Sequence, residues 1–547
     1  MAPRHSSVVL FYKYFLPSDY PLLHEHARYY ETKLHQFQKD LCDRLALKGR
    51  VLLAAEGING TVSAESLNVL QSYMDAMEEF DLVQEFGVPE DCPDKDIASH
   101  NKTSYRIFQN IDWKTSNNHQ GVLEPFPDLK ISIVKEIIST GGTISVEDIR
   151  ENGGTHLPPS EFHRAITENP DAVLIDVRNT FEYEIGHFVH PASQNPAMNP
   201  EMVTFSSFES SFCDKKADEL KGKKVLMYCT GGIRCEKASV MLKKRGVTDV
   251  SQLQGGIHRY LEEYGDQGLF RGLNFVFDQR VAMSPAECQN PHAPSAKHDI
   301  VGKCVSCQGA FDELCGSRVC TVCRDLVLVC PSCQVQLREY HCMKHSSWKE
   351  CYFTFLEIVS KEELLSQSEQ LLRLRESFVP PSSYKNVRRT LSRQIEKVTQ
   401  RIDALDSGLA CADPNAPRRC RSCMEPLTSC DGRCWGFWKT KQTSSLKEVD
   451  ISKLGKIQAI SIGDLVQPGL HWNELRYGSK VGPDGKTRRG AVVELKSWGS
   501  GSDEIDCVAV KWVDTKKDEL LIYRWGTLSR NGIRMYDLKK IGNAVKE

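Results

Sequence analysis

The sequence predicts a multidomain α+β protein, in which cysteine-rich modules and a helical segment separate two mixed α/β domains from a small β-barrel. A length of 547 residues is enough for about three to four domains. Helical and strand-like hydrophobic patterns mix in the first half, whereas strand-like patterns dominate the end of the chain. The 21 cysteines are spread unevenly: nine fall between Cys304 and Cys351, and five fall between Cys411 and Cys434.

Composition excludes several classes of protein. Hydrophobic residues make up 40% of the chain, charged residues make up 26%, and the formal net charge is -2, which excludes a chain that is basic overall. No apolar run approaches the roughly 18 residues of a membrane span. The N-terminal residues are interrupted by Lys13 and are not typical of a secretory signal. We therefore expect no membrane partner and a cytoplasmic location, with the nucleus left open.

The first predicted domain, residues 5–150, has the order strand, helix, strand, strand, helix, strand. That order is typical of a ferredoxin-like, or acylphosphatase-like, fold. Ser63 is the expected N-cap of its second helix. The expected strands and helices cover residues 8–15, 21–48, 50–63, 63–80, 105–111 and 129–138.

The second predicted domain, residues 158–275, alternates short apolar runs with helical segments. The runs at 172–177 and 224–229 are continuous, as expected for strands of a parallel sheet that is buried on both faces.

The second of these runs ends at Cys229, which is the candidate catalytic nucleophile. A short loop, Thr230-Gly231-Gly232-Ile233-Arg234, leads from it to a helix expected from about Cys235 to Arg245. Two glycines let the loop curl with its N–H groups inward, and a helix N-terminus adds positive potential. This environment lowers a thiol pKa and cradles a persulfide or an anionic substrate.

The length of this loop separates two chemistries. Arg234 completes a C-x4-R pattern, one residue shorter than the C-x5-R of cysteine phosphatases, and the smaller cradle suits a sulfur atom. The alternative is a buried structural cysteine at a strand end. Cys235 is either a resolving thiol for Cys229 or a packed helix residue.

The segments 174–188, 227–239 and 253–260 resemble the rhodanese domain. The resemblance implies that Cys229 carries a persulfide, with Arg234 beside it. Asp176 and Arg178 match the family's D-x-R signature. The resemblance implies an ion pair between Arg178 and Glu182 that supports the domain, and a structural role for His187.

The segments 56–63, 126–138 and 275–281, together with the cysteine loop, resemble the bacterial tRNA uridine hydroxylase family over residues 5–335. That resemblance implies oxygen-dependent hydroxylation of the wobble uridine of tRNA. It also implies that the loop cysteine is needed and that the first domain helps to bind the anticodon arm.

Two cysteine-rich modules, at 300–350 and 411–440, predict structural zinc sites, because two CxxC turns supply the four thiolates of a tetrahedron. The spacing leaves the pairing of the turns open. His341, His345 and Cys351 are further candidates, and reduced cysteines without metal are the alternative. The predicted metal ligands are Cys304, Cys307, Cys315, Cys320, Cys323, Cys330, Cys333, Cys342, Cys420, Cys423, Cys430 and Cys434.

Residues 352–408 are predicted to be helical. Their second helix carries a basic run from Arg388 to Arg401 that is either a solvated face or an RNA contact. Residues 459–542 resemble the mind bomb/HERC-type domain of some ubiquitin ligases, which implies a small β-barrel that binds a protein partner. Its aromatic residues are candidates for a partner-binding groove, although most of them are expected in the core: Trp472, Tyr477, Trp512, Tyr523 and Trp525.

Three functions remain open at this level. The first is a rhodanese-type sulfurtransferase that uses a persulfide on Cys229 and needs a sulfur donor and a thiol acceptor. The second is a tRNA uridine hydroxylase. The third is a non-enzymatic adaptor that the C-terminal barrel links to the ubiquitin pathway. The cysteine loop favours the two enzymes over the adaptor.

Overall fold

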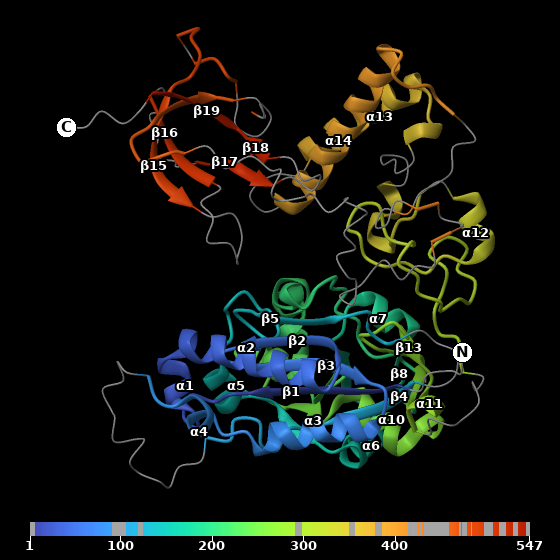
Figure 1. Cartoon of the computed structure of the whole chain (residues 1–547). Coiled ribbons are helices and arrows are strands. Elements are labelled where there is room, and N and C mark those ends of the chain that lie inside the picture. Colours follow the sequence, from blue (N-terminus) through green and yellow to red (C-terminus); the bar gives the residue numbers. More distant parts are fainter. Residues whose placement is uncertain are drawn as a thin grey trace. The chain divides into compact units, whose positions relative to one another are not determined.

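A computed structural model describes most of the first three quarters of the chain and shorter parts of the rest (Figure 1). The described residues are 6–89, 105–118, 124–289, 298–337, 339–348, 356–377, 385–413 and shorter stretches between 420 and 542. They form two units, residues 1–440 and 441–547, and each unit is considered by itself.

The first domain, residues 6–137, is a five-stranded sheet with the order β4-β1-β3-β2-β5. Its first four strands in chain order, with two pairs of helices between them, follow the predicted βαββαβ topology, and β5 adds a parallel strand beside β2. The elements are β1 (Ser6–Tyr14), α1 (Pro21–Glu25), α2 (Ala27–Arg44), β2 (Lys48–Ala54), β3 (Gly57–Ala64), α3 (Leu67–Glu79), α4 (Leu82–Phe86), β4 (Lys114–Asn118) and β5 (Leu129–Ile133).

Two expectations for this domain were wrong in detail. Residues 105–111 form turns, although Tyr105, Ile107 and Phe108 are buried in the core as their apolar character requires. The fourth strand is instead the polar segment β4, which pairs with β1 at the edge of the sheet, where a strand needs little apolar surface. The N-cap of α3 is Ser66, whose side chain accepts a hydrogen bond from the Val69 N–H.

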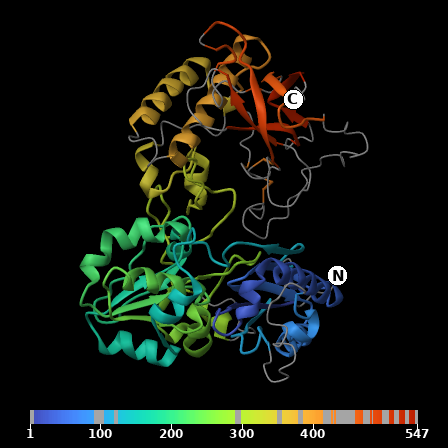
Figure 2. The same cartoon turned by 90° about the vertical axis from the view of Figure 1, so that its left-hand side faces the viewer.

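The second domain, residues 144–289, contains the predicted parallel sheet, drawn in teal to green in Figure 2. Its strands have the order β6-β10-β9-β7. Strand β9 is buried along its whole length, which explains the continuous apolar run. The elements are α5 (Val146–Asn152), β6 (Thr155–Leu157), α6 (Pro159–Glu168), β7 (Val173–Asp176), α7 (Thr180–Ile185), β8 (Gly186–Phe188), α8 (Asp214–Leu220), β9 (Val225–Tyr228), α9 (Ile233–Lys243), β10 (Val250–Leu253), α10 (Gly256–Tyr264), β11 (Phe270–Gly272), β12 (Asn274–Phe275), β13 (Ala282–Met283) and α11 (Pro285–Gln289).

A buried cation joins the two domains. Lys237 of α9 has no solvent exposure, and its ammonium lies 2.9 Å from a carboxylate oxygen of Glu56 and 3.0 Å from one of Glu136. It also donates to the Ile138 carbonyl at 3.1 Å. Glu56, Glu136 and Ile138 all belong to the first domain or to the segment that leaves it. An ammonium out of water needs such partners, so the ion pairs fix how α9 meets the first domain.

The next part of the first unit combines a cysteine-rich module with a helical hairpin. Helix α12 (Pro331–Gln336) belongs to the module, and α13 (Lys361–Ser377) and α14 (Lys385–Asp406) form the hairpin. One hydrophobic cluster joins them: Leu364 and Leu371 of α13 and Leu391 and Val398 of α14 pack with buried cysteines of the module. Among the helices of the described residues, none has the length and apolar character needed to cross a bilayer.

The second unit contains an antiparallel sheet of six strands, in the order β18-β17-β16-β15-β14-β19. The edge strands β18 and β19 are separated only by Asp537, so residues 534–542 pair with β17 through their first part and with β14 through their last part, and the sheet curls into a half-barrel. Trp472, Trp512, Tyr523 and Trp525 are buried, as expected, and Tyr477 lies outside the described residues. The strands are β14 (Leu465–Pro468), β15 (Gly490–Lys496), β16 (Cys507–Trp512), β17 (Leu521–Leu528), β18 (Arg534–Tyr536) and β19 (Leu538–Gly542).

Replacing Lys237 by methionine should weaken the joint between the first and second domains. The change leaves Glu56 and Glu136 without their buried cation, and breaking a buried ion pair costs about 3–5 kcal/mol of folding free energy. We expect a value near the low end, because both carboxylates keep some contact with solvent. Urea denaturation measures it.

Lys216→Met is the matched control, because Lys216 pairs with Glu219 on the exposed surface of α8. It should cost less than about 1 kcal/mol. Equal stability of the two variants would show that the buried cluster does not hold the domains together.

Candidate active site

Cys229 follows the last residue of β9 and is completely buried. The Gly232 N–H donates to its Sγ at 3.1 Å. Gly232 has φ +104°, a backbone conformation that residues with a side chain rarely adopt, so glycine permits the tight curl that turns this N–H inward. Helix α9 begins at Ile233, two residues earlier than expected, and this places Arg234 in its first turn.

The surroundings of Cys229 favour the thiolate. Burial alone raises the pKa of this thiol, but a hydrogen bond from Cys235, the charge of Arg234 and the backbone N–H groups of Arg234 and Cys235 outweigh it. Together they lower the pKa of Cys229 to about 6. The thiolate therefore predominates at neutral pH, and it is the nucleophilic form of cysteine.

Cys235 is a partner of this thiolate. It is completely buried in the first turn of α9, and its pKa is raised well above the usual value by burial and by its hydrogen bond to Cys229. The geometry therefore makes Cys235 a protonated hydrogen-bond donor. A role of Cys235 in resolving an oxidised or persulfidated Cys229 stays a prediction.

Arg234 is held by a buried carboxylate and not by solvent. Its guanidinium makes two hydrogen bonds with Glu182, at 2.7 and 2.8 Å, and a third with the Thr230 hydroxyl at 3.2 Å. The pKa of Glu182 is lowered, because Arg234 and Arg178 outweigh the effect of burial. Glu182 therefore positions Arg234 beside the cysteine loop.

The ion pair predicted between Arg178 and Glu182 was wrong. Arg178 binds Asp176 through two hydrogen bonds of 2.8 and 2.6 Å, because Asp176 lies two residues before it and presents both oxygens to the guanidinium. The Nδ1–H of His187 donates to the Tyr183 carbonyl at 3.0 Å, and the His187 ring stacks on the Tyr183 ring. Asp176, Arg178 and His187 thus bond to one another or to nearby backbone in the wall behind the cysteine loop, and their structural role stays a prediction.

The first domain covers the cysteine loop. A Cβ atom on Gly231 would lie 3.0 Å from a Leu10 methyl, and one on Gly232 would lie 2.8 Å from the Tyr12 hydroxyl. Both contacts come from β1. The two glycines thus serve the close approach of another domain as well as the curl of the loop. Leu10 and Tyr12 were missed from the sequence, because nothing in a strand pattern shows what its residues meet in another domain.

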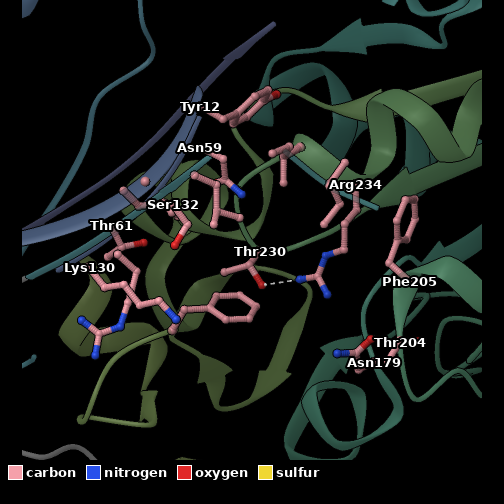
Figure 3. Close-up of a pocket in the computed structure, with 18 residues that line it drawn as sticks. Tyr12, Asn59, Thr61, Lys130, Ser132, Asn179, Thr204, Phe205, Thr230 and Arg234 are labelled. Atoms are coloured by element: carbon pink, nitrogen blue, oxygen red, sulfur yellow. Dashed lines mark hydrogen bonds between the residues drawn. The ribbon is translucent and has the colours of Figure 1, made fainter. Parts of the chain in front are cut away.

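A pocket of about 410 Å³ opens beside the loop, between the two domains (Figure 3). Thr230, Gly231, Ile233 and Arg234 contribute the second domain's wall, together with Phe277. The first domain contributes Leu10, Tyr12, Arg50, Leu52, Asn59, Gly60, Thr61, Lys130 and Ser132. Most of these residues were not predicted. The volume is in the usual range for a small-molecule or cofactor site.

A buried carboxylate lies on the other side of Tyr12. Glu236 accepts hydrogen bonds from the Tyr12 hydroxyl at 3.0 Å and from the Gln252 amide at 2.9 Å, and His156 lies 2.9 Å away. The hydrogen bond to Glu236 raises the pKa of His156. This network fixes Tyr12 above the loop and so helps to shape the pocket.

The cysteine-rich module contains two groups of four residues that could hold a metal ion. Within each group the ligand atoms lie within 4.8 Å of one another. Cys304 and Cys307 join Cys330 and Cys333, whereas Cys320 and Cys323 join Cys342 and His345. This arrangement decides the pairing that the spacing left open.

Cys315 was a wrong assignment, because its sulfur lies 3.0 Å from the Ser317 hydroxyl and belongs to neither group. His345, and not Cys315, is the fourth member of the group that contains Cys320, Cys323 and Cys342. In the second module, Cys420 and Cys430 are described, but Cys423 and Cys434 lie outside the described residues, so that site stays a prediction.

Three family models match successive segments of the chain between residues 6 and 351. The UPF0176 acylphosphatase like domain matches residues 6–137, the Rhodanese-like domain matches 158–263, and the Rhodanase C-terminal model matches 271–351. The tRNA uridine(34) hydroxylase of Corynebacterium urealyticum is 35% identical over 306 residues, which cover 55% of this chain and 88% of that protein. The chain belongs to the tRNA uridine(34) hydroxylase family of rhodanese-domain proteins. Its members are enzymes.

Two further relatives show how the family varies in length. The tRNA uridine(34) hydroxylase of Corynebacterium jeikeium is 33% identical over 356 residues, covering 64% of this chain and 96% of that protein. Rhodanese-like domain-containing protein 6 of Arabidopsis thaliana is also 33% identical, over 351 residues. That match covers 61% of this chain but only 52% of the Arabidopsis protein.

The titration of Cys229 tests this description of the site. Because its pKa is lowered to about 6, the thiolate should be present above that pH and lost below it. Cys235→Ala removes a charge-assisted hydrogen bond worth about 1.5–3 kcal/mol, which corresponds to a midpoint about one to two pH units higher. Ultraviolet absorbance of the thiolate, corrected with Cys229→Ser, follows the titration.

Cys235→Ser is the matched control, because a hydroxyl also donates a hydrogen bond. Its midpoint should stay near that of the parent protein. If the alanine and serine variants titrate alike, Cys235 is not the donor that stabilises the thiolate.

Proposed function

We propose that this protein hydroxylates uridine 34 of tRNA, as the names of its bacterial relatives state for those proteins. The observation that carries the proposal is the pocket between the first two domains, since it meets the Cys229 loop on one side and the sheet of the first domain on the other. A site for sulfur transfer alone needs only a cradle for a small anion.

The lining of the pocket supports a nucleotide as its occupant. Lys130 is exposed, and Arg50, which pairs with Asp128 at 2.6 Å, lies on the same wall. Such cations suit the phosphates of an RNA backbone. Phe277 and Phe205 offer aromatic surface to a base, and Asn59, Ser132 and Thr230 offer hydrogen-bonding groups. We propose that an unstacked uridine enters here.

Cys229 is the residue that we propose to carry the chemistry. Its thiolate is preformed at neutral pH, and the N–H groups of the loop and the charge of Arg234 stabilise negative charge at that position. Glu182 acts through Arg234 by holding the guanidinium in place. Tyr12 and Leu10 exclude water from the loop.

Rhodanese-type sulfur transfer is the second candidate. The Gly232 N–H at 3.1 Å from the sulfur of Cys229 favours it, because the same N–H groups would stabilise a persulfide. In this reaction Cys229 takes a sulfur atom from a sulfane donor and passes it to a thiol acceptor.

We also propose that both four-ligand groups bind structural zinc. Thiolate and imidazole are the ligands that Zn²⁺ prefers, and groups of four protein ligands leave no open position for catalysis. Small cysteine-rich modules bury little apolar surface, so metal binding supplies part of their folding free energy.

The C-terminal half-barrel has a separate proposed role. We propose that it is a mind bomb/HERC-type module that binds a protein partner linked to the ubiquitin pathway. Its support is the resemblance of residues 459–542 and the independent sheet of the second unit.

Cells that lack this protein should lose hydroxylated uridine at position 34 of tRNA, and mass spectrometry of modified nucleosides measures that loss. The wild-type chain and Cys213→Ala should restore the nucleoside, because Cys213 is buried in the second domain and does not line the pocket. Cys229→Ser should not restore it.

An unchanged nucleoside profile would contradict the hydroxylase proposal. Sulfur transfer then gains support if the protein's mass rises by one sulfur atom on exposure to a sulfane donor and Cys229→Ser abolishes the gain.

The purified protein should contain two zinc ions in the 304–345 module. Cys330→Ser and His345→Ala should each lower the zinc content by about one ion, because each removes one ligand of a different group. Cys315→Ser is the control and should keep all the zinc. Elemental analysis decides the matter, and full zinc content in the first two variants would contradict the proposed ligands.

A further inference from the structure

Helix α14 carries basic residues at every fourth position, which no part of the proposed site uses. They occur at positions 385, 389, 393, 397 and 401. Residues four apart lie on one ridge of a helix, and sixteen residues at 1.5 Å each extend that ridge over about 24 Å. The side chains of Arg389, Arg393 and Lys397 are exposed in its middle.

The charge of this helix differs in sign from that of the chain. Helix α14 contains six basic and three acidic residues, a formal charge of +3, whereas the whole chain has -2. Arg401 is not counted with the exposed basic residues, because its guanidinium donates a hydrogen bond to the Cys411 carbonyl at 2.7 Å. The basic ridge, defined as Arg389, Arg393 and Lys397, is thus a local concentration of positive charge on a mildly acidic protein.

The opposite face of α14 anchors the ridge. Leu391 and Val398 are completely buried, and they share one hydrophobic cluster with α13 and with Cys304 and Cys320 of the metal-binding module. The ridge is therefore fixed to a packed scaffold. Its geometry is set before any partner arrives, so binding does not have to order the helix.

The same packing argues against a membrane as the partner. A helix that lies on a bilayer inserts an apolar face, and the apolar face of α14 is already buried in the hairpin. A row of evenly spaced cations without exposed apolar residues between them suits a regular polyanion. The phosphate backbone of RNA is such a polyanion.

We propose that the basic ridge of α14 binds the phosphate backbone of the tRNA whose uridine enters the pocket. This inference rests on the proposed function. Contacts between the basic ridge and phosphates depend on charge and are independent of base sequence, because cations at phosphates position a nucleic acid without distinguishing its bases. The hairpin thereby supplies affinity, while the pocket beside Cys229 supplies selection of the nucleotide.

The test is the salt dependence of tRNA binding by the full-length protein. The variant combines Arg389→Gln, Arg393→Gln and Lys397→Gln. Each phosphate contact contributes about 0.7–0.9 to the slope of log affinity against log salt, so the slope should become shallower by about two to three. Affinity at low salt should fall by about tenfold or more.

The matched control removes three exposed cations of the second domain: Lys216→Gln, Lys221→Gln and Lys244→Gln. It makes the same change in net charge and should keep the parent slope. Circular dichroism and zinc content establish that both variants are folded. An unchanged slope in the α14 variant, or an equal change in the control, overturns the proposal. The proposal also fails if the α14 variant keeps its tRNA binding and loses only the binding of an acidic protein.

This experiment separates the ridge from the proposed chemistry. Cys229→Ser should bind tRNA with the parent slope, because it removes no phosphate contact. If cells with Cys229→Ser lack the hydroxylated nucleoside while the α14 variant keeps its salt slope, the function stands and the ridge proposal fails. If the slope falls but the nucleoside never depended on the protein, the ridge binds RNA and the proposed reaction is wrong.

Discussion

The site depends on the burial of one ammonium group between two domains. Lys237 lies on α9 only four residues after the helix begins and is therefore close to the cysteine loop. The ion pairs that hold Lys237 thus also fix where this loop meets β1. The pocket exists because of this docking, since neither the sheet of the first domain nor the loop of the second encloses it alone. Electrostatics between the domains thus sets the geometry of the chemistry.

The electrostatics within the second domain follow the same pattern of paired burial. Glu182 is matched by Arg234, and Asp176 is matched by Arg178. A buried guanidinium without such a carboxylate would be too costly to keep beside the loop. Because both pairs are satisfied, Arg234 stays charged and the thiolate of Cys229 remains favourable at neutral pH.

Local features of the fold were predictable from the sequence, and contacts between distant segments were not. Strands β7 and β9 are continuous apolar runs, and the strand that ends at Cys229 followed from them. Strand β4 is polar and its register with β1 arises from long-range pairing, so its pattern gave no signal. Residues 105–111 carried a strand-like pattern because apolar side chains enter a core from turns as well as from strands.

The same distinction holds for the site. Cys229, the glycines and Arg234 are neighbours in sequence, and their chemistry could be argued from their order. The covering residues Leu10 and Tyr12 lie more than 200 positions away, and no local rule connects them to the loop. In the cysteine-rich module, the two four-residue groups interleave along the chain, so equal CxxC spacings could not show which turns come together.

The close contact of Leu10 and Tyr12 with Gly231 and Gly232 has a chemical consequence for the lifetime of the enzyme. A thiolate at neutral pH is the form that peroxide oxidises to sulfenic acid and then irreversibly to higher oxidation states. Here Cys229 has no exposed surface, because it packs in the core of the second domain and because Leu10 and Tyr12 of the first domain cover the loop beside it. Docking of the first domain therefore helps to keep oxidants from the thiolate, and separation of the two domains would leave the cysteine loop more open to oxidation.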